Sequence, residues 1–170
     1  LRGSVIGSCH TRIQNQLLKP IYTQKKLLSV WWNVHGVIYW ELLPEKATVT
    51  AVLYRTQLHR LALELQKKSP KPGKIYFHHD NAKRHVAKIV QKKIKSLNWE
   101  LVPHPPYSPD IAPSDYHLFL SLSNQLKGKK FENETDLKQF FKQFFDSRPK
   151  GFYAKGIHDL PRRWQEIIDN

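Results

Sequence analysis

Two aspartates, Asp80 and Asp115, are the acidic residues of this chain whose surroundings best suit metal chemistry. Asp80 follows a short apolar run that ends at His79, and Asp115 follows a proline-rich stretch and precedes a helical pattern. A carboxylate at a strand end and one at a helix start can converge on Mg²⁺, which prefers oxygen ligands and keeps several waters. The alternative is structural, because Asp-Asn after a strand commonly forms a turn and Ser-Asp commonly caps a helix.

Two linked motifs decide between these alternatives. They comprise His79, Asp80, Asn81 and Ala82 with His85 after them, and the stretch His104–Phe119, which reads HPPYSPDIAPSDYHLF. Both resemble the signatures of mariner-family transposases around their second and third catalytic aspartates. The thirty-four residues between Asp80 and Asp115 also match the family spacing. The resemblance covers roughly Lys25 to the end of the chain, and it extends to the transposase part of SET-domain/mariner fusion proteins.

The resemblance implies an α/β fold of the ribonuclease H-like, retroviral integrase-like kind, with helices flanking a mixed sheet. Mariner enzymes cut both DNA strands at transposon ends and join the freed 3′ hydroxyl to target DNA, using two divalent ions. The ions activate the attacking oxygen and stabilise the leaving oxygen of an in-line displacement at phosphorus. By resemblance, Asp80 and Asp115 are catalytic metal ligands, the cofactor is Mg²⁺ or Mn²⁺, and the partner is double-stranded DNA.

The family's first catalytic aspartate, which lies on the first strand of its sheet, has no counterpart in this sequence. The first acidic residue of the chain is Glu41, which falls in the third strand of the family pattern. A segment from Gly3 to His10 could pair as a substitute strand and bring Cys9 or His10 to the site, but neither side chain suits Mg²⁺. We therefore expect the first strand to be missing or replaced.

An incomplete carboxylate set predicts that DNA cleavage and strand transfer are impaired while DNA binding remains. One alternative is an active metal-dependent endonuclease or transposase that uses an acid or a segment not evident in this chain. Another is a co-opted, non-enzymatic DNA-binding module. The chain contains no Met and begins at Leu1, so we expect a processed piece or a truncated copy, without the family's two N-terminal helix-turn-helix modules.

The charge of the chain favours a polyanionic partner, because 28 Lys and Arg stand against 14 Asp and Glu and give a formal net charge of +14. Lys88, Lys92 and Lys95 recur on one helical face, and the alternative for them is an ordinary solvated face. With Lys83 and Arg84 they form a candidate DNA-binding surface.

No apolar run of membrane-spanning length occurs. We expect no membrane partner, no small-molecule substrate and a nuclear location.

Residues 1–26 show no sustained period and carry five basic residues and no acidic one, so we expect an irregular basic arm before a catalytic domain over residues 27–170. In the family this region joins the first two strands and helps two protomers meet, which leaves a homodimer open. The patterns that follow predict a hairpin, helices, two short strands and a non-helical proline loop. Their expected ranges are Leu27–Trp32 and Val37–Leu43 for the hairpin, Thr48–Ser69 for a helix, Lys74–His79 for a strand, Val86–Leu97 for a helix, Trp99–Pro103 for a strand, His104–Pro113 for the loop, Ser114–Gly128 for a helix capped by Ser114, and Leu137–Phe145 and Leu160–Ile168 for the last helices.

Three histidines, His78, His79 and His85, surround Asp80 in the sequence, which raises the possibility of a zinc site. Alternation along a strand would send His78 and His79 to opposite faces, which favours packing or DNA contact instead. The adjacent Trp31 and Trp32 are expected in the core.

Overall fold

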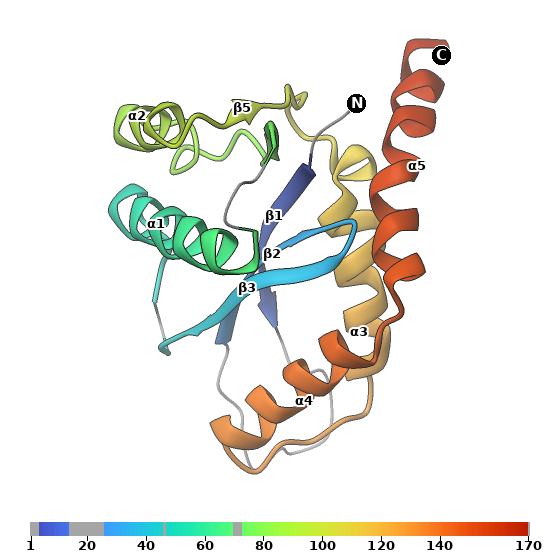
Figure 1. The fold of residues 1–170 in the computed structure, drawn as a ribbon. Helices are drawn as coiled ribbons and strands as arrows, with labels where there is room; N and C mark the ends of the chain where they lie inside the picture. The colour runs from blue at the N-terminus through green and yellow to red at the C-terminus, as the bar shows by residue number, and fades with distance from the viewer. Residues whose placement is uncertain (1–3, 14–25, 46, 70–72, 170) are drawn as a thin grey trace.

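A five-stranded mixed sheet forms the centre of the molecule (Figure 1). The computed structural model describes residues 4–13, 26–45, 47–69 and 73–169. The strands follow the order β3-β2-β1-β4-β5, with β1/β2 and β2/β3 antiparallel and β1/β4 and β4/β5 parallel. Their bounds are β1 Ser4–Ile13, β2 Lys26–Asn33, β3 Gly36–Leu43, β4 Ile75–His78 and β5 Glu100–Leu101. The predicted hairpin is therefore confirmed as β2 and β3, and the strand predicted over Trp99–Pro103 is shorter.

The central strand, β1, corrects the prediction of an irregular arm over residues 1–26. That prediction is wrong for Ser4–Ile13, and the domain boundary at residue 26 is wrong with it, because β1 belongs to the sheet. The sequence of β1 lacks a sustained apolar alternation, but β2 and β4 each have backbone donors and acceptors that need a partner between them. β1 provides both, since Gly7–Ile13 pairs with β2 and Ser4–Gly7 pairs with β4.

The first strand is thus not missing, and the expectation that residues 3–10 pair as a strand is confirmed for the backbone of residues 4–10. The side chains of Cys9 and His10 lie outside the described part of the chain, as do residue 3 and residues 14–25, where the linker remnant was expected.

Helices cover both faces of the sheet. Figure 1 shows α1 (Ala51–Lys68) and α2 (Lys88–Ser96) on one side, and α3 (Leu120–Leu126), α4 (Glu134–Ser147) and α5 (Lys150–Asp169) on the other. Each side has its own apolar core. Over the described residues, no helix combines the length and the apolar character needed to cross a membrane.

The two tryptophans of β2 connect the sheet to both cores. Trp31 packs in the core under α1, Trp32 packs in the core formed with α3, α4 and α5, and both side chains are fully buried. Their opposite directions follow from strand alternation. The core prediction is confirmed for both.

The last helix is longer than the sequence predicted. α5 begins at Lys150 rather than near Leu160, and Pro161 lies inside it. The buried residues of α5 recur at helical spacing and are Tyr153, Gly156, Ile157 and Leu160. The first half of the helix therefore packs one face against the core.

The proline-rich loop also departs from prediction at its end. Pro109–Ile111 forms one 3₁₀ turn, η1, within the stretch that we expected to contain no helix. Ser114 does not cap the next helix, because Pro113 precedes it and the Ser114 hydroxyl instead accepts a hydrogen bond from the Trp32 indole. That next element, η2 (Ser114–Phe119), is a π-helical turn, a geometry that often occurs at functional sites.

Candidate functional site

Asp80 and Asp115 line the same open pocket, which has a volume of about 640 Å³. Asp80 lies just beyond the end of β4, and Asp115 lies in the first turn of η2. The structure therefore brings together the two aspartates that the motifs singled out. The other residues of the pocket come from the segment after β4 and from the proline-rich loop, and they are Asn81, Ala82, Lys83, His104, Pro106, Tyr107, Ser108 and Pro109.

The Asp80 carboxylate is held by two hydrogen bonds to one of its oxygens. Asp80 Oδ1 accepts from the Ala82 backbone N–H at 2.9 Å and from His85 Nδ1. Partial burial raises the pKa of Asp80, but His85, the Ala82 N–H and the Arg84 guanidinium together hold that pKa well below its usual range. The carboxylate is therefore ionised at neutral pH, and both of these bonds engage Oδ1 rather than Oδ2.

His85, in turn, is fixed within a buried aromatic cluster. Its ring is 1% exposed and contacts both Tyr54 of α1, at 4.2 Å between ring centroids, and His79, at 5.1 Å, and these two rings also contact each other at 5.9 Å. The Tyr54 hydroxyl bonds His79 Nδ1 at 3.0 Å. Burial lowers the pKa of His79 to about 3, so this imidazole is neutral at physiological pH. The packing prediction is confirmed for His79 and His85, and their burial leaves neither ring exposed for contact with DNA.

Asp115 is positioned by contacts of the residues around it. Trp32 Nε1 donates to Ser114 Oγ at 2.9 Å, which joins η2 to β2. Tyr116 donates its hydroxyl proton to the backbone carbonyl of Gly156 at 2.6 Å, which joins η2 to α5. Both bonds are made by immediate neighbours of Asp115, so sheet and helix together fix the backbone that carries this carboxylate.

Arg163 of α5 adds a second connection to the same region. Its guanidinium lies 3.9 Å from the centroid of the Tyr116 ring, and its Nη1 donates to the backbone carbonyl of Asp110 at 3.0 Å. A cation over an aromatic face is attractive, and more so where water is partly excluded. Arg163 therefore ties the proline-rich loop and η2 to one helix.

His104 connects the loop to β4. His104 Nδ1 and His78 Nε2 are 3.1 Å apart, and Asn81 Nδ2 donates to the backbone carbonyl of His104. Burial lowers the pKa of His78 to about 4 and lowers that of His104, whereas the charges of Asp80 and Asp115 oppose the shift at His104. That both carboxylates act on His104 is consistent with one shared pocket.

Comparison with known proteins agrees with this geometry. A family model described as "Transposase (partial DDE domain)" matches residues 11–75. The fold of a solved structure of the Mos1 transposase catalytic domain with Raltegravir and Mg matches this one with a TM-score of 0.88 and 39% identity, over 95% of this chain and 80% of that chain. The chain belongs to the mariner family of transposases. The ribonuclease H-like α/β fold expected from its motifs is thereby confirmed.

The chain spans less than half the length of two curated relatives that it matches. The Mariner Mos1 transposase of Drosophila mauritiana is 42% identical over 151 residues, which make up 86% of this chain and 44% of that protein. Histone-lysine N-methyltransferase SETMAR of Homo sapiens is 38% identical over 156 residues, 89% of this chain and 23% of that protein. A Mos1 mariner paired end complex with Mn matches with a TM-score of 0.91 and 35% identity, over 97% of this chain and 54% of that chain.

The donor set of this mariner domain suits one divalent ion better than two. Two carboxylates with waters suffice for a single Mg²⁺ or Mn²⁺. β1 contacts both β4 and η2, the elements next to Asp80 and Asp115, yet its ten residues include no Asp or Glu. Over the described residues, no three His, Cys, Asp or Glu side chains are grouped closely enough to hold a metal. The candidate metal ligands that line the pocket are therefore the two carboxylates of Asp80 and Asp115.

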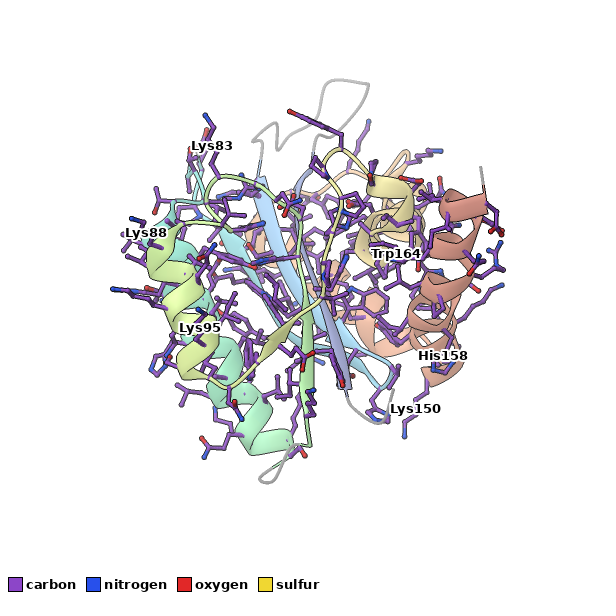
Figure 2. The ribbon with its side chains drawn as sticks, turned by 90° about the horizontal axis from the view of Figure 1, so that it is seen from above. Lys83, Lys88, Lys95, Lys150, His158 and Trp164 are labelled. Carbon is purple, nitrogen blue, oxygen red and sulfur yellow. The ribbon has the colours of Figure 1, made fainter. Side chains whose placement is uncertain are left out.

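The predicted basic surface lies on the α2 side of the mariner domain. Lys83, Lys88, Lys92 and Lys95 are exposed, whereas Arg84 is half-buried and donates from Nε to His85 Nε2 at 3.3 Å. Figure 2 shows Lys83, Lys88 and Lys95 along the same side of the molecule. Only Lys83 of these residues also lines the aspartate pocket.

Sequence reasoning did not identify the residues that support the two aspartates. Arg163 and Trp32 act through contacts between segments that are far apart in the chain, and no local pattern signals them. The spacing of His85 from Asp80 is visible in the sequence, but that spacing alone does not predict the bond between them. The His-Asp spacing of five residues was the one available signal.

Proposed function

We propose that this mariner-derived chain binds double-stranded DNA and holds a single divalent ion between Asp80 and Asp115, with DNA cleavage and strand transfer strongly reduced. One observation carries the proposal: the pocket keeps two supported carboxylates, while β1, the strand that contacts the elements next to both of them, has none. Displacement of reacting groups by about 1 Å can cost roughly 10²-fold in rate, so loss of a ligand that positions the ions has a large effect.

DNA binding is supported by charge and by relatives. The formal net charge is +14, and Lys88, Lys92 and Lys95 are exposed along α2 with Lys83 at the pocket. Cations that neutralise phosphates release counterions and give salt-dependent binding without sequence preference. The similar Mos1 transposase has been solved as a paired end complex, which supports DNA as the partner and a homodimer as the assembly.

Mg²⁺ or Mn²⁺ is the ion that the carboxylate pair would select, since both are hard cations that prefer oxygen ligands. Asp80, ionised and with both of its described hydrogen bonds at Oδ1, and Asp115, on a fixed π-helical turn, would hold it. When bound, such an ion supplies Lewis-acid stabilisation to a phosphate oxygen. The protein's own part is to keep both carboxylates in place and Asp80 deprotonated.

Binding of the ion is tested by Mn²⁺ electron paramagnetic resonance on the wild type, Asp80→Ala and Asp110→Ala. Asp110 is a suitable control because it is an exposed aspartate of the same loop region that does not line the pocket. We expect about one bound Mn²⁺ in the wild type and in Asp110→Ala, and a loss of at least tenfold in affinity in Asp80→Ala. Equal Mn²⁺ affinity in all three proteins would contradict the proposed ion site.

Cleavage is tested by nicking of supercoiled plasmid in Mn²⁺ with the same variants. We expect no nicking by the wild type above the level of Asp80→Ala. The intact support of both aspartates favours one second candidate, a working endonuclease that receives its third acid from elsewhere. Nicking that requires Asp80 would establish that candidate, whereas absence of both nicking and Mn²⁺ binding would indicate a non-enzymatic DNA-binding module.

The DNA surface is tested by replacing Lys88, Lys92 and Lys95 with Gln and measuring duplex affinity at several salt concentrations. If all three lysines contact phosphates, the slope of log affinity against log salt falls by about 2.7, at roughly 0.9 for each contact. The control replaces three exposed lysines outside this surface, Lys130, Lys142 and Lys150. If both sets of replacements have equal effects, net charge alone explains the binding.

A nuclear location follows from the DNA partner and is tested by imaging a fluorescent fusion.

A further inference from the structure

Tyr107 has the most exposed large apolar side chain described in this structure, with an exposed fraction of 103%. Large aromatic rings usually gain stability by burial, and an exposed one gives up that gain. Within the described part of the chain, its ring has no stacking or cation contact with another side chain. The fold therefore does not need this ring for packing.

The backbone of Tyr107 is held in a conformation that a tyrosine rarely adopts. Its φ is +57°, in the left-handed region that favours Gly and Asn. Pro105 and Pro106 precede it and Pro109 follows, so the loop has little freedom to relax, and Ser108 Oγ bonds the Pro106 carbonyl at 3.0 Å. Such strain persists where the surroundings impose it, and it is concentrated at ligand-binding sites.

Tyr107 lines the same pocket as Asp80, Asp115 and Lys83. An aromatic face, a cation and two carboxylates that suit a divalent ion thus share one opening. A nucleic acid has a feature for each, because its bases stack on aromatic rings, its phosphates pair with lysine, and metal ions bridge carboxylates to phosphate oxygens.

We propose that Tyr107 is a stacking platform for one unpaired DNA base at the pocket. The proposal rests on the proposed DNA binding and refines it from a general attraction to phosphates to a preference for DNA with unpaired nucleotides. A paired base inside a duplex offers no free face, whereas an unpaired or extruded base does. Tyr107 thereby distinguishes a frayed, nicked or overhanging DNA end from continuous duplex.

The test uses two fluorescein-labelled DNAs with the same duplex, one blunt and one with a short single-stranded overhang, and measures affinity by fluorescence anisotropy. The wild type should prefer the overhang, and Tyr107→Phe should retain this preference because it keeps the ring. Tyr107→Asn removes the ring and suits the left-handed backbone, so it should melt at the wild-type temperature or above. Its affinity for the overhang DNA should fall by about 5- to 150-fold, the range for loss of one base–aromatic stack.

Ile168→Ala is the matched control, since Ile168 is 70% exposed at the far end of α5 and should leave both affinities unchanged. In a second measurement, 2-aminopurine in the overhang should be quenched by the wild type and by Tyr107→Phe but not by Tyr107→Asn. An unchanged overhang affinity in Tyr107→Asn, or an equal loss for blunt and overhang DNA, would overturn the stacking site while salt-dependent DNA binding stands. Failure of the wild type to bind either DNA would overturn the proposed function and the stacking site together.

Discussion

Gly156 occupies a point of close contact between α5, η2 and β2, and its replacement by Ala tests how rigidly the Asp115 side of the pocket is built. A Cβ at this position would lie 2.5 Å from His117 Cδ2 and 2.9 Å from both His117 Cγ and Trp32 Cη2. Carbon atoms normally pack at about 3.5–4.0 Å, so these rings would have to move by roughly 0.5–1 Å or more.

Neither ring is free to move at low cost. Trp32 is fully buried and its indole donates to Ser114, while His117 Nε2 donates to the Phe152 carbonyl at 2.8 Å. Overpacking of this kind typically destabilises the folded state by about 1–3 kcal/mol, whereas the higher helix propensity of Ala relative to Gly stabilises it by up to ~1 kcal/mol. We expect Gly156→Ala to lower the free energy of unfolding by about 1–2 kcal/mol and the melting temperature by about 2–8 °C.

The measurement is urea denaturation and calorimetry of Gly156→Ala beside Gly151→Ala. Gly151 lies in the same helix, but a Cβ there meets no atom within 4 Å, so its replacement should be neutral or stabilising by a few tenths of a kcal/mol. In a His117→Ala background, the cost of Gly156→Ala should become smaller, since one of the two clashing rings is gone. If Gly156→Ala were as stable as Gly151→Ala, the close packing of α5 on η2 would be refuted.

Two further predictions concern buried polar groups. Because burial lowers the folded-state pKa of His78 to about 4 and of His79 to about 3, the unfolded chain takes up protons first as the pH falls below about 6.5. The free energy of unfolding should therefore fall by about 2 kcal/mol for each imidazole between pH 7 and pH 5, and urea denaturation showing equal stability at both values would contradict this. Ser114→Ala leaves the buried Trp32 Nε1 donor unsatisfied and should cost about 1–3 kcal/mol in the same assay, whereas the exposed Ser123→Ala should stay within about 0.5 kcal/mol, and equal effects would show that the bond contributes nothing.

The parts of the fold that were predictable are those with strong local signals. β2 and β3 carry β-branched and aromatic runs around a short turn, where Asn33 Oδ1 accepts from the His35 N–H. α1 has an apolar stripe, and Thr50 caps it by accepting from the Leu53 N–H. In these segments, backbone preference, side-chain burial and turn chemistry all favour the same structure.

The parts that were not predictable depend on distant partners. β1 forms because two neighbouring strands offer it hydrogen bonds, which its own sequence does not reveal. Ser114 has the residue type and the position of a helix cap, but its hydroxyl instead accepts a hydrogen bond from the buried indole of Trp32, eighty-two residues away. For the site, the motifs indicated both aspartates, whereas the pocket that contains them depends on how the loop after β5 returns to β4.

The central strand β1 shows that forming the sheet and supplying a carboxylate are separate requirements. A central strand is held largely by backbone hydrogen bonds, which any non-proline residue can make, so the sheet does not require an acidic residue at this position. The two remaining aspartates are supported by other elements, with His85 and the Ala82 N–H at Asp80, and with β2 and α5 behind Asp115. A carboxylate, in contrast, must come from one particular side chain, and β1 has no acid to provide it. The fold and the two aspartates are therefore present together with a central strand that carries no carboxylate.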